Sequence, residues 1–152
     1  MNVSLAQNIS ICIGRLALSG PKIVSKHLDK FLNLFCLSLT YIKDSPEKRD
    51  SFKGLCESIS FNPKAVFNSF NQLCEAFCYY ENPPQDLEKT FQKIIYSFSV
   101  TYKEKFYQSV SNFPDDLKIK MKEKFKIQID WPLFFLNECY IIYYNFCVSI
   151  VL

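Results

Sequence analysis

The sequence predicts an all-α protein, a fragment of an α-solenoid built from antiparallel helix pairs. Apolar residues recur with helical spacing in the long segments, and no segment alternates with period two for long enough to indicate a strand. All seven prolines lie between these segments, where they can start a helix without breaking one. With 49% hydrophobic residues, 22% charged residues and only 3 glycines in 152, the chain is neither disordered nor collagen-like.

Each expected helix has its own start or stop signal. Gly20 ends the first helix and Pro21 starts the second, while Ser45 is a capping residue directly before Pro46. The expected helices cover residues 3–19, 22–41, 47–60, 64–80, 86–98, 103–112 and 115–126. The connections are short, so neighbouring helices should be antiparallel. We expect these aromatic residues between the layers: Phe31, Phe35, Phe52, Phe70 and Phe91.

A weak internal repeat accompanies the helices. Gly14 and Gly54 each lie within an apolar helix and precede a helix that starts at a proline. Their separation falls in the range of helix-pair repeats in HEAT and armadillo proteins, which is about 40–47 residues. Three weakly similar units are few, however, and an ordinary helical bundle accounts for the spacing equally well.

Few residues in the chain favour catalysis or metal binding. Cys74 and Cys78 are one helical turn apart, but no second pair completes the four ligands of a zinc site, and His27 lies among charged residues. There is no phosphate-binding glycine loop and no nucleophile motif. We therefore expect no enzyme, cofactor or metal. A net charge of +3 is too small to indicate a nucleic-acid-binding protein, although lysines gather in residues 118–126.

The motifs of the chain resemble those of the transportin, or importin-beta-2, family of nuclear import receptors. The similarity runs in order through residues 5–126, nearly without gaps, and corresponds to the C-terminal end of the receptor. The matching motifs are Asn8-Ile-Ser-Ile-Cys-Ile-Gly-Arg-Leu16, Tyr41-Ile-Lys-Asp44, Phe52-Lys-Gly-Leu-Cys56, Ile59-Ser-Phe-Asn-Pro63, Pro84-Gln-Asp-Leu87 and Phe113-Pro-Asp-Asp-Leu-Lys118. The resemblance implies HEAT repeats, with residues 3–19 as the second helix of a pair whose first helix is absent.

The resemblance also implies a function in cytoplasm and nucleus. The partners would be nuclear localisation signal peptides of cargo proteins, while the receptor's Ran-binding repeats have no counterpart here. The implied cargo-binding residues are Asn8, whose amide can bond a peptide backbone, and Ile11, an apolar wall one turn away. Packing of Ile11 within the solenoid explains its position equally well.

Two parts of the chain should behave differently from a complete receptor. The helix over residues 3–19 should expose the apolar stripe of Leu5, Ile9 and Leu16, because its partner helix is absent.

Residues 127–152 form an apolar tail without a counterpart in the family, which divides the chain into 1–126 and 127–152. The tail keeps a membrane-associated protein open as an alternative. Glu138 argues against a membrane span, and so does the apolar run from Cys139, which is shorter than the roughly 20 residues that a spanning helix needs. An inactive truncated fragment is the third possibility.

Overall fold

The computed structural model describes residues 3–40 and 42–125, and throughout this part of the chain the regular structure is helical, without strands. The elements are α1 (Val3–Ser19), α2 (Pro21–Val24), η1 (Ser25–His27), α3 (Leu28–Thr40), α4 (Pro46–Phe61), η2 (Pro63–Ser69), α5 (Phe70–Cys78), α6 (Gln85–Thr101), α7 (Lys103–Ser111) and α8 (Asp115–Phe125), where η denotes a 3₁₀-helix. The all-α prediction is therefore confirmed. The predicted boundary at residue 126 and the tail beyond it lie outside the described residues.

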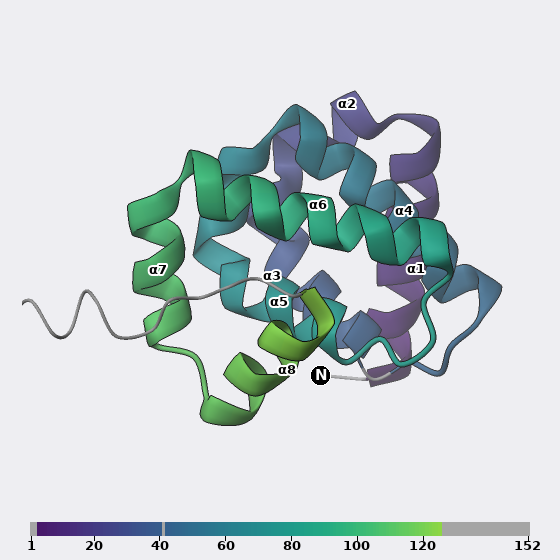
Figure 1. Ribbon diagram of the computed structural model, residues 1–152. Helices are drawn as coiled ribbons and strands as arrows, with labels where there is room; N and C mark the ends of the chain where they lie inside the picture. The colour runs from purple at the N-terminus through teal and green to yellow at the C-terminus, as the bar shows by residue number, and fades with distance from the viewer. Residues whose placement is uncertain (1–2, 41, 126–152) are drawn as a thin grey trace, which may run out of the picture.

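The helices form two rows that stack along the chain. In one row, α1 packs on α4 and α4 packs on α6; in the other, α3 packs on η2 and α5, and α5 packs on α8 (Figure 1). Contacts between α1 and α3 and between α3 and α4 join the rows. This arrangement is that of a HEAT-repeat fragment, in which each helix pair packs mainly on its neighbours.

Two of the expected α-helices contain 3₁₀ segments, which is a correction to the sequence prediction. The helix expected over 22–41 is interrupted by η1, where the Asn62 Nδ2 donates a 3.0 Å hydrogen bond to the Ser25 carbonyl. A carbonyl that accepts from another part of the chain is less available for the regular α-helical pattern. The helix expected over 64–80 begins as η2 and becomes α-helical only at Phe70, because Ser69 leaves the helical region with φ −131° and ψ 22°.

Aromatic rings fill the space between the two rows. The Phe77 and Phe91 rings stack with centroids 3.9 Å apart, and the Phe52 ring packs on both, at 6.0 Å and 5.5 Å. Four of the five predicted core aromatics are fully buried: Phe35, Phe52, Phe70 and Phe91. Phe31 is only half-buried, because the side of α3 that carries it borders an open hollow.

A close approach between α1 and α4 depends on two glycines. A Cβ at Gly14 would lie 2.7 Å from the Ser51 Oγ. A Cβ at Gly54 would lie 2.9 Å from both the Ala17 Cβ and the Leu18 backbone nitrogen. These distances are too short for any real Cβ atom, so both positions admit only glycine at this helix separation.

Replacing Gly54 by alanine should lower the free energy of unfolding by about 3 kcal/mol, the upper end of the range for overpacking, because the backbone atoms it meets cannot move aside. Gly20→Ala is the matched control, since a Cβ there would meet only the Ile23 Cδ1 and the Leu16 carbonyl, both at 3.8 Å. At this capping position we expect a loss of at most about 1 kcal/mol. Urea unfolding followed by circular dichroism measures both, and equal losses would contradict the close approach.

Candidate functional site

Asn8 and Ile11 lie on the same side of α1, as the sequence predicts for residues three apart. Asn8 is exposed and Ile11 is half-buried. At about 100° per residue, Arg15 shares this side, whereas Ile9 and Ile13 point to the other side of the helix. We call the surface of Asn8, Ile11 and Arg15 the polar side of α1.

An ion pair joins the polar side of α1 to the next helix of its row. The Arg15 Nη2 lies 3.5 Å from the Glu47 Oε1, and both side chains are about half exposed. Exposed pairs of this kind contribute about 0–1 kcal/mol, so the contact does little for stability and leaves the charged groups accessible. Sequence reasoning missed Arg15 and Glu47 as site residues, although Arg15 follows Ile11 by four residues and therefore had to share its side.

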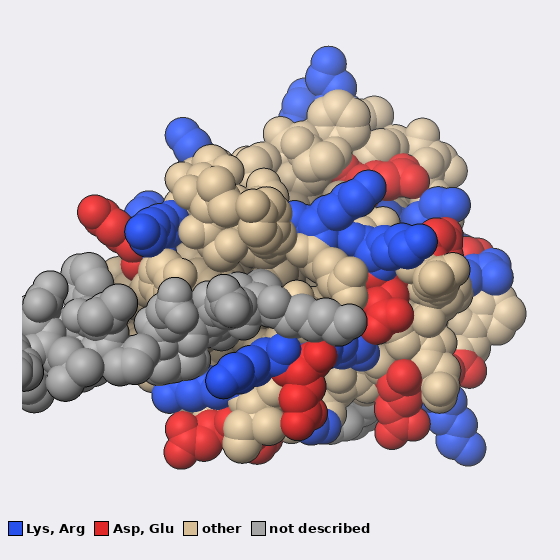
Figure 2. All heavy atoms as spheres, viewed as in Figure 1, with Lys and Arg blue, Asp and Glu red and all other residues tan. Residues whose placement is uncertain are grey.

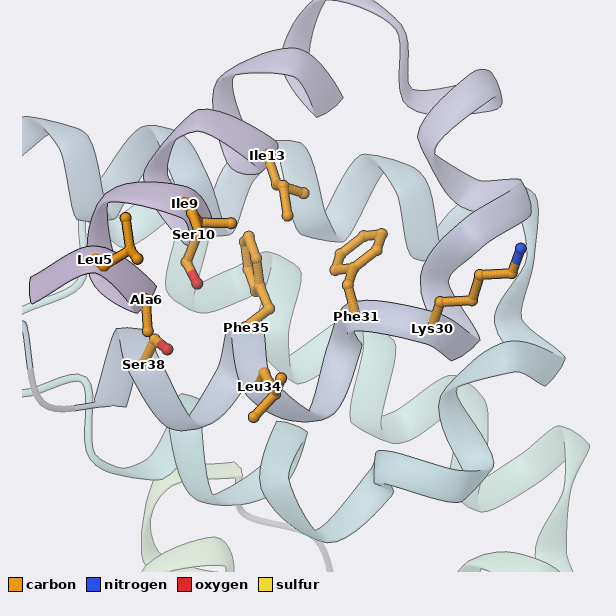
Figure 3. Close-up of a pocket in the computed structure, with 10 residues that line it drawn as sticks. All are labelled: Leu5, Ala6, Ile9, Ser10, Ile13, Lys30, Phe31, Leu34, Phe35 and Ser38. Carbon is orange, nitrogen blue, oxygen red and sulfur yellow. The ribbon is translucent and has the colours of Figure 1, made fainter. Parts of the chain in front are cut away.

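The other side of α1 forms one wall of an apolar hollow of about 190 Å³. Figure 3 shows α1 and α3 running antiparallel along it, with Ile13 near Phe31 and Lys30 at one end. The hollow is lined by Leu5, Ala6, Ile9, Ser10, Ile13, Lys30, Phe31, Leu34, Phe35 and Ser38. Neither Asn8 nor Ile11 contributes to it, so the predicted cargo residues and the hollow are separate surfaces.

The predicted exposed stripe of the first helix is confirmed. Leu5 is 58% exposed, Ile9 is 50% exposed and Leu16 is 64% exposed. Leu34 of α3, 53% exposed, continues this apolar surface across the hollow.

The thiols of Cys74 and Cys78 are buried in the core and are not arranged as metal ligands. Burial raises the pKa of Cys78 to about 12, and burial also raises the pKa of Cys74 well above its ordinary value. Thiols with raised pKa values are poor nucleophiles and poor ligands, because both roles require the thiolate. Within residues 3–40 and 42–125, no group of three or more potential ligands lies close enough to hold a metal ion. His27 is exposed on η1.

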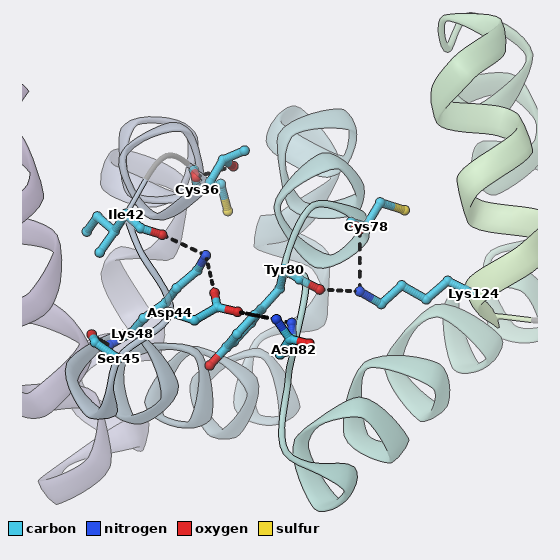
Figure 4. Close-up of polar contacts among 10 residues, drawn as sticks. Cys36, Ile42, Asp44, Ser45, Lys48, Cys78, Tyr80, Asn82 and Lys124 are labelled. Atoms are coloured by element: carbon cyan, nitrogen blue, oxygen red, sulfur yellow. Dashed lines mark hydrogen bonds and ion pairs between the residues drawn. The ribbon is translucent and has the colours of Figure 1, made fainter.

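A polar cluster fastens the loops between the helix pairs (Figure 4). The Lys48 side chain is only 3% exposed, and its Nζ donates to the Asp44 Oδ1 at 3.0 Å and to the Ile42 carbonyl at 2.9 Å. Asp44 also accepts a 3.0 Å hydrogen bond from the Asn82 backbone N–H, 38 residues further along the chain. The Lys48 ammonium lies 4.6 Å from the centre of the Tyr80 ring. Asp44 thus ties the loop before α4 to the loop before α6.

The electrostatics of this cluster favour a structural role. Partial burial by itself raises the pKa of the Asp44 carboxyl, but hydrogen bonds from Lys48 and Asn82 outweigh burial and hold the pKa below its ordinary value. At the next step along the stack, the Lys124 Nζ of α8 donates to the carbonyl of Cys78, the last residue of α5, and to the Tyr80 carbonyl in the loop that follows. The printed contacts of Lys48, Asp44 and Lys124 all run to other parts of the chain, as expected for groups that fix loops in place.

The surface charge is mixed. On the face that Figure 2 shows, lysine and arginine side chains are interspersed with aspartate and glutamate. Interspersed charges of both signs produce no broad field of one sign on that face. In the part of the chain that the structure describes, no helix is long and apolar enough to cross a membrane. The apolar tail at 127–152, on which the membrane alternative depends, lies outside that part.

Comparison with known proteins finds transportins and an importin subunit beta-2. No protein-family model matches the chain. It is 34% identical over 121 residues to Transportin-1 of Mus musculus, which is 80% of this chain and 13% of that protein. It is 26% identical over 130 residues to Transportin of Dictyostelium discoideum, 86% of this chain and 14% of that protein. Importin subunit beta-2 of Schizosaccharomyces pombe is 31% identical over 94 residues, 62% of this chain and 10% of that protein.

These relatives confirm the resemblance that the sequence motifs indicate. The chain is homologous to a short part of transportins and importin beta-2, and it spans about one eighth of the length of the mouse relative. The matches with the mouse and Dictyostelium proteins cover most of this chain, which is consistent with a shared HEAT-repeat architecture.

Replacing Asp44 by asparagine should remove a stabilising contribution that depends on pH. Because the folded-state pKa of Asp44 is lowered, its contribution is present above the ordinary value of 3.8 and is lost as the pH falls through the lower folded-state value. At pH 7 we expect Asp44→Asn to cost about 1–3 kcal/mol, since it leaves the buried Lys48 ammonium without its carboxylate. The difference from wild type should shrink below about pH 4.

Urea unfolding at a series of pH values measures this difference. The control is Asp115→Asn, because the Asp115 side chain is 94% exposed and pairs with Lys118 at 3.5 Å. We expect a change of no more than about 0.5 kcal/mol for the control at every pH. A difference for Asp44→Asn that stays constant down to pH 2 would contradict the assigned role of the carboxylate.

Proposed function

We propose that this chain acts as part of a nuclear import receptor and binds a nuclear localisation peptide of cargo along the polar side of α1. The observation that carries the proposal is the homology to transportins, combined with the exposure of Asn8 on a helix side shared by Ile11 and Arg15. The proposal describes a binding protein and not an enzyme, present in cytoplasm and nucleus.

The chemistry of this side suits an extended peptide. The Asn8 amide has both donors and acceptors, which is what an extended backbone needs, because its own N–H and C=O groups are unpaired. Ile11 supplies an apolar wall one turn further along α1, and Arg15 with Glu47 adds charges of both signs. A disordered peptide loses conformational entropy on binding, so these few anchors should support only weak affinity.

The division of the chain follows from the same argument. Residues 1–126 are the proposed receptor-like module, and 127–152 are proposed to be an addition that the binding function does not require. The proposal includes no binding of Ran, because the resemblance assigns Ran binding to repeats that have no counterpart in this sequence.

The cargo proposal is tested with a dye-labelled nuclear localisation signal peptide that a complete transportin binds, by fluorescence anisotropy on the full chain. The double variant Asn8→Ala with Ile11→Ala should weaken binding five- to thirtyfold, as expected for a loss of about 1–2 kcal/mol. The matched control is Asn33→Ala with Leu37→Ala, an exposed amide and an exposed apolar residue one turn apart on α3. We expect no change of affinity in the control.

Two results would contradict the proposal in different ways. Equal weakening by both double variants would show that the peptide does not select the polar side of α1. No detectable binding by the wild-type chain, while a complete transportin binds the same peptide, would favour an inactive fragment.

Deleting residues 127–152 should leave the helical circular dichroism spectrum and the unfolding midpoint of the remainder unchanged and should increase solubility. The reason is that the resemblance to the receptor covers residues 5–126 and includes none of the deleted residues. Extraction of cell membranes with carbonate tests the alternative. A full chain that stays with the membrane, while the deletion variant is released, would support a membrane anchor instead.

A further inference from the structure

One side of α6 carries a row of exposed side chains that belongs neither to the core nor to the polar side of α1. Lys89, Lys93, Tyr96 and Val100 follow one another at intervals of four, three and four residues, so they lie along the same side of the helix. Tyr96 is 65% exposed and Val100 is 61% exposed, whereas the other large apolar residues of α6 are buried or half-buried. We call these four residues the α6 stripe.

The α6 stripe is basic in its first half and apolar in its second half. In Figure 2, basic side chains (blue) extend over the half of α6 that begins at Gln85, and uncharged surface (tan) covers the half that ends at Thr101. Among the described residues, neither Lys89 nor Lys93 has an acidic group within ion-pair distance. Exposed apolar surface edged by polar groups is a common mark of a protein interaction site.

α4 adds a third lysine beside the α6 stripe. The Phe52 and Phe91 rings are in contact, with centroids 5.5 Å apart, so Lys53 lies about level with Lys93 across the two helices. Lys53 is exposed, and it also forms no ion pair with any described residue. Three ammonium groups on two neighbouring helices are thus left with their charges unpaired.

Two acidic side chains near these lysines do not cancel their charge. Asp86 lies in the first turn of α6, where the positive end of the helix dipole already attracts it. Glu57 lies one turn beyond Lys53 on α4 and is half-buried. Three positive groups against two negative groups leave a net positive charge, which favours an acidic ligand over a basic one.

The length of the α6 stripe suits a short extended peptide. From Lys89 to Val100 the helix rises about 16 Å, at about 1.5 Å per residue. An extended chain covers this distance with about five residues, at about 3.3 Å each. A helical ligand would need several apolar anchors at intervals of three to four residues, and the stripe offers only Tyr96 and Val100.

We infer that the α6 stripe binds a short, extended acidic segment of a partner protein, with carboxylates toward Lys89 and Lys93 and one aliphatic or aromatic side chain on Tyr96 and Val100. Segments rich in one charge are disordered when free, so their backbone is available in extended form. Charge complementarity sets the register of such a ligand, and the aromatic anchor contributes affinity. The inference is independent of cargo binding, since the two surfaces lie on different helices and share no residue.

The test uses a dye-labelled, end-capped peptide of sequence Asp-Glu-Asp-Gly-Leu-Phe-Gly as the probe. Fluorescence anisotropy with the full chain at low salt should show saturable binding, which weakens as sodium chloride is added because exposed charges are screened. Lys89→Glu with Lys93→Glu should weaken binding about tenfold or more, because the carboxylates of the probe then meet like charges. Tyr96→Ala with Val100→Ala should weaken it about fivefold through loss of the apolar anchor.

The matched control is Lys26→Glu with Lys30→Glu, a pair of exposed lysines with the same spacing on η1 and α3. We expect this control to bind the probe as wild type does, and circular dichroism checks that each variant folds. A second probe with lysines in place of its acidic residues should not bind. The double variant Asn8→Ala with Ile11→Ala should bind the acidic probe normally, which separates this inference from the cargo proposal.

Three outcomes would overturn the inference. The first is equal weakening by the two lysine double variants, which would indicate attraction to positive charge anywhere on the chain. The second is the absence of saturable binding by a folded wild-type chain. The third is binding that appears only after residues 127–152 are deleted, which would assign the α6 stripe to the chain's own tail.

Discussion

The close contact between α1 and α4 determines which residues of α1 face which direction. Gly14 and Gly54 bring the two helices so close that neither position has room for a Cβ. A contact made by backbone atoms cannot adapt as flexible side chains do, so it fixes both the distance and the rotation of α1. Once that rotation is fixed, Asn8 and Arg15 must face one way and Ile9 and Ile13 the other.

Side-chain contacts then extend this order along the stack. The rings of Phe52, Phe77 and Phe91 connect α4, α5 and α6, which are neighbours in space but come from two repeats. At the edge of the layers, Asp44 receives hydrogen bonds from Lys48 of its own repeat and from Asn82 of the next. A single carboxylate thus holds two loops in register, which explains why a lysine is buried beside it.

The sequence predicts well those features that depend on local rules. Pro46 with Ser45 marks the start of α4, and the Ser45 side chain does accept a hydrogen bond from the Lys48 N–H, at 3.2 Å. Features that depend on contacts between distant residues were not predictable. The interruption at η1 involves the Asn62 side chain, 37 residues away. From the sequence alone, Lys48 is expected to be exposed to solvent. Its burial is explained only by the position of Asp44 in the folded structure.

The candidate site likewise has some features that the sequence predicts and others that it does not. The spacing of Asn8 and Ile11 predicts a shared helix side, and the structure has them there, but their role in cargo binding comes from resemblance and remains a prediction. The hollow was predictable only in part. The apolar stripe of α1 is visible in the sequence from its helical spacing, whereas the contribution of Leu34 and Lys30 requires the position of α3.

The two sides of α1 differ in their chemistry. An extended peptide has unpaired N–H and C=O groups and needs side chains such as the Asn8 amide to replace lost water. The opposite side of α1 presents the apolar wall of Ile9 and Ile13 and few polar groups. Because the close contact at Gly14 holds α1 in one rotation, its two sides cannot exchange places. The polar side and the apolar side are therefore separate surfaces that face different directions.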